Sequence, residues 1–116
     1  MKIFIIVNLQ VEGTHNWPEC PIEEVSFLKH RHRHIFHITC KKEVSHNDRQ
    51  IEIIRLKRQI EYHLRKSFGE GELSAEGCFF GRMSCEDIAL HLLNKFNLYS
   101  CTVLEDNENG AQIISQ

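Results

Sequence analysis

The sequence predicts an α+β fold, in which an antiparallel four-stranded sheet carries two helices on one face. Two observations lead to this prediction: segments rich in Ile and Val, or alternating in polarity, stand near both ends of the chain, and segments of helical spacing stand between them. The resulting order, β-β-α-α-β-β, groups strands with strands and helices with helices, as layered α+β domains do. Of the 116 residues, 41% are apolar, so residues 1–116 are expected to form a single domain.

The first two strands are expected at residues 2–11 and 32–44. The first, KIFIIVNLQV, is rich in β-branched residues, and the second, HRHIFHITCKKEV, alternates before it ends in polar residues. Residues 13–29 hold a glycine and both prolines of the chain, and they predict a loop with one helical turn near Glu23–Leu28.

Two helices are expected in the middle of the chain. The segment 45–50, SHNDRQ, offers side chains that cap a helix N-terminus, and residues 51–68 follow with helical spacing. Their apolar stripe consists of Ile53, Leu56, Ile60, Leu64 and Phe68. Ser84, with Asp87 three residues later, resembles a capping box and opens a second helix at residues 85–97. Its stripe consists of Ile88, Ala89, Leu92, Leu93 and Phe96.

The end of the chain predicts a hairpin. Residues 99–105 (YSCTVLE) and 111–115 (AQIIS) are expected to be strands, and DNENG between them has the composition of a turn. The connection between the two helices contains several glycines and is expected to be irregular.

Charge and cysteine content limit the classes of function. Fourteen Lys and Arg against sixteen Asp and Glu give a formal charge of -2, whereas general nucleic-acid binders carry a basic excess. No stretch of about 18 apolar residues is present, so no membrane span is expected. The five cysteines have no regular spacing, and no secretory signal precedes them. The sequence therefore predicts free thiols and a reducing cytoplasm.

The most informative stretch is HRHRHIFH, because it concentrates imidazoles on one expected strand. His32 and His34 are two residues apart, so they share a face of the strand, about 7 Å from each other, and can converge on one metal ion. His37 falls on the opposite face. A third ligand is available in His15, in the loop after the first strand. The alternative interpretation is a strand whose exposed face is simply polar.

These residues stand in the order of a known family's motifs. His15 lies in VEGTHNWP, His32 and His34 lie in HRHIF, and Glu105 precedes Ala111 by six residues in EDNENGA. The segments RQIEIIRLK and SCEDIA resemble the same family's helix motifs. Over about residues 2–115 the chain thus resembles, as a divergent member, the 6-pyruvoyltetrahydropterin synthase and 6-carboxytetrahydropterin synthase family, which has the tunnelling fold.

The resemblance implies a zinc site, a heterocycle site and a homo-oligomer. His15, His32 and His34 would hold Zn²⁺, and Glu105 would anchor the amino-pyrimidine edge of a pterin- or purine-like molecule at a subunit interface. The chemistry suits that role, because an ionised carboxylate accepts two N–H bonds at once. The alternative for Glu105 is a strand-end residue that only starts a turn.

Two departures from the family put its reaction in doubt. Leu28 stands where the reactive Cys is expected, and the connection between the helices lacks the family's Asp-His pair. Cys20 lies further upstream and is the remaining candidate for a catalytic thiol, or is an ordinary buried thiol. Two further residues are candidates for ligand binding: Trp17, which can stack on a flat heterocycle or pack on the sheet, and Arg33, which can meet a phosphate or remain solvated.

Two functional hypotheses follow. The first is a zinc-binding protein of the tunnelling fold that binds a pterin- or purine-like heterocycle, and that acts as a 6-pyruvoyltetrahydropterin synthase-like lyase if it is an enzyme. The second is a non-catalytic protein, of the kind a phage encodes as a sponge, that sequesters a purine nucleotide signal. A scaffold role with neither metal nor ligand is the third alternative.

Overall fold

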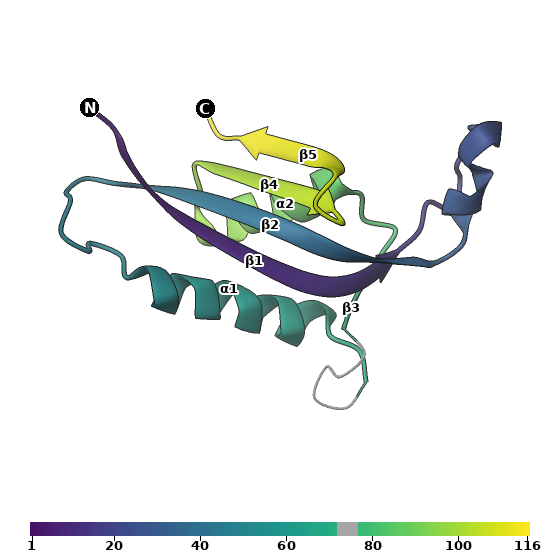
Figure 1. Ribbon diagram of the computed structural model, residues 1–116, viewed down its shortest axis with the longest axis horizontal. Coiled ribbons are helices and arrows are strands. Elements are labelled where there is room, and N and C mark those ends of the chain that lie inside the picture. The colour runs from purple at the N-terminus through teal and green to yellow at the C-terminus, as the bar shows by residue number, and fades with distance from the viewer. Residues whose placement is uncertain (72–76) are drawn as a thin grey trace.

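A computed structural model describes residues 1–71 and 77–116 and shows an α+β fold built on a five-stranded mixed sheet (Figure 1). The strands are β1 (Ile3–His15), β2 (His32–Val44), β3 (Cys78–Gly81), β4 (Ser100–Glu105) and β5 (Asn109–Ile114). The helices are the 3-10 helix η1 (Glu23–Lys29), α1 (Ile53–Phe68) and α2 (Cys85–Phe96). The strand order across the sheet is β3-β1-β2-β4-β5.

The predicted four-stranded antiparallel sheet with two helices is wrong, because β3 adds a parallel pair and η1 adds a third helix. Residues 78–81 pair in parallel with the end of β1, and every other neighbouring pair of strands is antiparallel. The strand has four residues, which is too short to show a period in the sequence. Its parallel partner is more than sixty residues away, so no local pattern indicates the pairing.

The long hairpin of β1 and β2 forms the centre of the sheet and ends at the region that carries the histidines. Both strands have 13 residues, and their register runs from Ile3 opposite Val44 to His15 opposite His32. The segment with η1, dark blue in Figure 1, projects at the end of the hairpin opposite to the two termini. Residue 15, expected in a loop, is therefore the last residue of a strand.

Local capping groups fix where the helices begin. The side chain of Glu52 accepts hydrogen bonds from the backbone N–H groups of Ile54 and Arg55, and α1 begins after it rather than after the expected 45–50 segment. The capping box of α2 is confirmed, because Ser84 and Asp87 exchange side-chain and backbone hydrogen bonds. The helix bounds differ from the expected ones by one or two residues.

One hydrophobic core lies between the helices and one face of the sheet. The two apolar stripes are largely confirmed: Leu56, Ile60 and Leu64 of α1 are buried, and so are four of the five α2 positions, whereas Ile53 is half exposed. The other sheet face carries alternate residues of the same strands, including the exposed Ile6 and Ile114. Over the described residues, no helix combines the length and the apolar character needed to cross a bilayer.

Candidate metal centre

The strand register brings the three predicted histidines together on the core-facing side of the sheet. His15 and His32 are direct cross-strand partners, and His34 is opposite Gly13, against which the ring edges of Phe80 and Phe36 pack closely. The ring centroids lie 4.6 Å apart for His15 and His32, 5.0 Å for His32 and His34, and 5.4 Å for His15 and His34. The three imidazoles therefore form one cluster.

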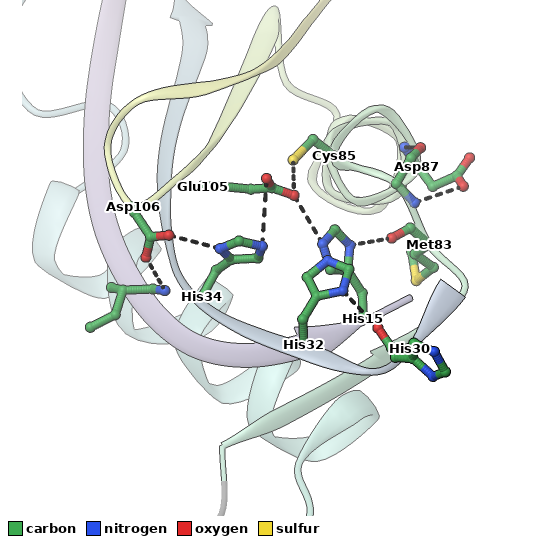
Figure 2. Close-up of polar contacts among 11 residues, drawn as sticks. His15, His30, His32, His34, Met83, Cys85, Asp87, Glu105 and Asp106 are labelled. Atoms are coloured by element: carbon green, nitrogen blue, oxygen red, sulfur yellow. Dashed lines mark hydrogen bonds and ion pairs between the residues drawn. The ribbon is translucent and has the colours of Figure 1, made fainter. Parts of the chain in front are cut away.

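A carboxylate from a third strand completes this cluster. Glu105 ends β4 opposite Phe36 of β2, and its side chain points at the imidazoles, as Figure 2 shows. Its Oε2 lies 2.9 Å from Nε2 of His15, and its Oε1 lies 3.6 Å from Nε2 of His34. One ligand atom from each of His15, His32, His34 and Glu105 lies within 4.8 Å of all the others, a spacing that can hold a metal ion.

The Nδ1 atom of each imidazole is held by an oxygen on the outer side of the cluster. The acceptors are the carbonyl of Met83 for His15 at 2.9 Å, the carbonyl of His30 for His32 at 2.8 Å, and Oδ2 of Asp106 for His34 at 2.7 Å. Because these oxygens can only accept, each Nδ1 carries a hydrogen in the neutral ring, and the lone pair lies on Nε2. Metal-binding histidines have this arrangement.

The hydrogen bond to His34 is made by an ionised carboxylate. Asp106 follows Glu105 in the β4–β5 turn, and its Oδ1 also accepts a hydrogen bond from the backbone N–H of Ile35 at 3.0 Å. The hydrogen bond with His34, followed by that with Ile35, lowers the pKa of Asp106 below its ordinary value.

Two of the three Nε2 atoms lack a hydrogen bond although they are buried. They belong to His15 and His34. Among the described residues, every other buried side-chain nitrogen or oxygen atom has a hydrogen-bond partner. Burial lowers the pKa of His15, which favours the neutral ring. A neutral His15 directs its Nε2 lone pair at a carboxylate oxygen 2.9 Å away, so two acceptors face each other. A cation between them would remove this conflict.

A cavity of about 560 Å³ opens beside the cluster. The end of β1, the start of α2 and the β4–β5 hairpin surround it, and His15, His32 and Glu105 form part of its wall. Trp17, 42% exposed, also lines it, as do Asn16 and Asn109. The predicted aromatic residue is therefore at the cavity, next to the imidazole cluster.

Two predicted site residues lie elsewhere. Arg33 alternates to the opposite face of β2 from His32 and His34, and its Nε donates to Oε1 of Glu12 at 2.7 Å. The thiol of Cys20 is directed into its own loop, where it contacts the carbonyl oxygens of Ile22 and Val25 at 3.7 Å. Neither residue is in the wall of the cavity.

Sequence reasoning missed three contributors to the site. Asp106 directly follows Glu105 in the sequence, and this adjacency to a predicted site residue is the one feature that could have indicated its role. Cys85 begins α2, lines the cavity, and directs its thiol at Oε2 of Glu105 at 3.7 Å. Burial, then the negative charge of Glu105, raises the pKa of this thiol to about 12. Met83 contributes only a backbone carbonyl, so its residue type carries no signal.

Comparison with known proteins adds no relative: no family model matches the chain, and no curated protein sequence matches it.

Proposed function

We propose that the protein binds a zinc ion through His15, His32 and His34 and uses the adjoining cavity to bind a pterin- or purine-like heterocycle. The observation that carries this proposal is the convergence of three imidazoles, each held through its Nδ1, beside a carboxylate. The heterocycle class comes from the resemblance described above and from the chemistry of the cavity wall.

The donor set suits zinc. Zinc sites with chemical roles use three protein ligands, often imidazoles, with nitrogen and oxygen donors at about 2.0–2.2 Å. A bound zinc ion would supply Lewis-acid polarisation of an oxygen atom on the ligand.

The residues of this chain would orient a flat ligand. Trp17 places an aromatic ring in the cavity wall, on which a flat ligand can stack, and the carboxylate of Glu105, which also lines the cavity, can accept two N–H groups from an amino-pyrimidine edge. Asn16 and Asn109 add neutral donors and acceptors to the wall. Each of these groups binds or positions; none of them is a strong base.

The thiols and the remaining histidines favour a protein that binds its ligand without catalysis over a lyase. The thiol at the cavity, Cys85, has a raised pKa, and Cys20 is engaged in its own loop. Of the described histidines outside the cluster, His63 and His91 bond to each other between the two helices. Among the described residues of the cavity wall, the candidates for a general base are therefore the carboxylates and the proposed metal ligands. The described part of the wall contains no low-pKa thiol and no additional imidazole for this role.

Metal analysis of protein purified without a tag tests the zinc proposal. We expect zinc close to one equivalent per chain, and we expect His32→Ala to lose most of it. His37→Ala is the matched control, because His37 lies on the opposite face of the same strand and should leave the metal content unchanged. Absence of metal from the wild type, together with unchanged behaviour of His32→Ala, would reject the zinc site.

Ligand recovery tests the heterocycle proposal. The zinc-loaded protein is incubated with pterins and purines, separated from free ligand, and denatured. Release of intact ligand in stoichiometric amount supports a binding protein, and release of an altered product supports the lyase. Retention of no heterocycle contradicts both functions.

We also propose that the protein is a homo-oligomer with the cavity near a subunit interface. Along β1, β3 covers only residues 13–15, so the outer edge of residues 3–12 has no described strand partner, and the outer edge of β5 has none. Beside the cavity, η1 exposes Phe27 at 63%. Sedimentation equilibrium should give a multiple of 13.7 kDa; a monomer at micromolar concentration would contradict the proposal.

A further inference from the structure

The charged groups around the cavity differ from those of a phosphate-binding site. Of the described residues, four charged side chains line it besides the imidazoles: Arg82, Glu86, Asp87 and Glu105. Three carboxylates therefore face one guanidinium. A divalent metal at the imidazole cluster would offset the negative excess but would leave no positive excess for a phosphate.

The single lining guanidinium is already paired. The Nη2 atom of Arg82 donates to Oε2 of Glu19, on the loop that follows β1. A phosphate that bound Arg82 would lie next to this carboxylate, which carries the same sign of charge. Sites for phosphorylated ligands use Arg forks without an acidic partner, whereas the positive charge of Arg82 is already offset by Glu19.

The helix N-terminus at the cavity is also occupied. A helix start usually attracts anions, because its first backbone N–H groups lack partners and its dipole is positive there. In α2, Oγ of Ser84 accepts from the N–H of Asp87 at 3.1 Å, and Oδ2 of Asp87 accepts from the N–H of Ser84 at 3.1 Å. Glu86 and Asp87 add two negative charges to the first turn. The helix thus places two carboxylates of its own at the end where a ligand phosphate would bind.

From these three observations we infer that the cavity selects uncharged or cationic ligands and excludes phosphorylated ones. This inference rests on the proposed function and narrows it: the ligand is a free heterocycle or a nucleoside-like derivative, and not a nucleotide or a pterin phosphate. The nucleotide sponge is then disfavoured relative to a binder of unphosphorylated heterocycle. The electrostatic part of the inference can be tested without any heterocycle.

Trp17 is a built-in probe, because it lines the cavity and is the only tryptophan of the chain. We would quench its fluorescence in metal-free protein with Cs⁺ and with iodide, each normalised to N-acetyltryptophanamide at equal ionic strength. A negative potential at the cavity should make the normalised constant for Cs⁺ about 3-fold that for iodide. Glu86→Gln should reduce this ratio. Equal quenching by the two ions, or stronger quenching by iodide, would overturn the inference.

Calorimetry with the zinc-loaded protein then tests selection directly. The matched pairs are neopterin with its monophosphate and guanosine with guanosine 5′-monophosphate. We expect the phosphorylated member of a pair to bind at least about tenfold more weakly, which corresponds to about 1.4 kcal/mol. Glu19→Gln, which frees Arg82, should narrow the gap without changing the affinity for the uncharged member.

The outcomes separate the inference from the proposed function. Equal or tighter binding of the phosphorylated members overturns the inference and keeps the heterocycle pocket. Binding of none of the four probes contradicts the heterocycle pocket, and the quenching ratio of Trp17 still decides whether the cavity repels anions.

Discussion

The carboxylate of Asp106 accepts a hydrogen bond from Nδ1 of His34 at 2.7 Å, on the side of the ring that faces away from the imidazole cluster. The pair fixes the orientation of the ring and places its lone pair on Nε2, which points at Glu105. Asp106 is therefore a positioning residue for the proposed metal centre.

Asp106→Asn should weaken zinc binding by about 10–100-fold, because partners of this kind typically contribute that much to metal affinity. The amide keeps the size of the side chain but loses the charge. Competition with a chelator of known affinity measures the effect. Asp48→Asn, at an exposed position near the start of α1, is the matched control and should leave the affinity unchanged. Equal zinc affinities of the two variants would show that Asp106 does not contribute to metal binding.

The parts of the fold with a strong local period were predictable from the sequence. The β2 prediction, residues 32–44, agrees with the structure in both bounds, because most of the strand alternates and polar residues mark its end. The α2 start was predictable because Ser84 and Asp87 form a local capping motif. By contrast, β3 depends on a parallel contact with Gly13 and Thr14, far away in the chain, and nothing in CFFG indicates it.

The candidate site could be predicted in part for the same reason. His32 and His34 share a strand face, so their proximity is a local property. The position of the third imidazole depends on where β1 ends and on the hairpin register. The expected first strand, residues 2–11, is shorter than β1, and His15 was therefore expected in a loop. Backbone acceptors such as the Met83 carbonyl leave no trace in residue type. Strand alternation alone predicts that Arg33 lies on the opposite face of β2 from His32 and His34. Its ion pair with Glu12 could not be predicted in this way, because it depends on the register with β1.

Ser84→Ala should destabilise the protein by about 1 kcal/mol, within the range of N-cap replacements. The change removes the Oγ acceptor of the Asp87 N–H, whereas the backbone N–H of residue 84 can still donate to the Asp87 carboxylate. Urea unfolding monitored by circular dichroism gives the difference in the free energy of unfolding. Ser26→Ala, at an exposed position in η1, should change it by much less. Equal effects would show that the capping box contributes nothing to stability.

Gly13→Ala should destabilise the metal-free protein by about 1–3 kcal/mol, which is typical of overpacking. A Cβ on Gly13 would lie 2.7 Å from Cε2 of Phe80 and 3.1 Å from Cε2 of Phe36. The ring of Phe36 packs under His15 and His34, so its displacement should also weaken zinc binding.

Urea unfolding in the presence of a chelator measures the stability of Gly13→Ala, and zinc competition measures its affinity. The added change Phe80→Leu removes the closest contact and should recover part of the lost stability. A Gly13→Ala protein as stable as the wild type would show that the close packing of Phe80 and Phe36 on Gly13 does not require a glycine.

The stability of the metal-free protein should fall as the pH decreases below about 6.5, in part through His63 and His91. Their Nε2 atoms are 2.8 Å apart, and the centroids of the nearly parallel rings are 5.0 Å apart, so the rings point at each other across one N–H···N bond. Burial is the main cause that lowers the pKa of both rings, and the charge of Lys95 acts in the same direction.

The sign follows from proton binding. Because the folded-state pKa of each ring is lower than the ordinary value of 6.5, the unfolded chain binds more protons in the window below that value, and stability is lost as protons are added. One added proton preserves an imidazolium–imidazole bond between His63 and His91. A second proton leaves two donors facing each other, so the steeper loss belongs to the second protonation.

Urea unfolding between pH 8 and pH 5, with a chelator present throughout, tests this prediction. His91→Gln should show a smaller loss of unfolding free energy on acidification than the wild type. His37→Gln, on the outer face of the sheet and away from the pair, should keep the wild-type slope. His15, whose pKa is also lowered by burial, is present in all three proteins and cancels from the comparison. Parallel profiles of unfolding free energy against pH for His91→Gln and the wild type would show that protonation of His63 and His91 does not contribute to the loss of stability.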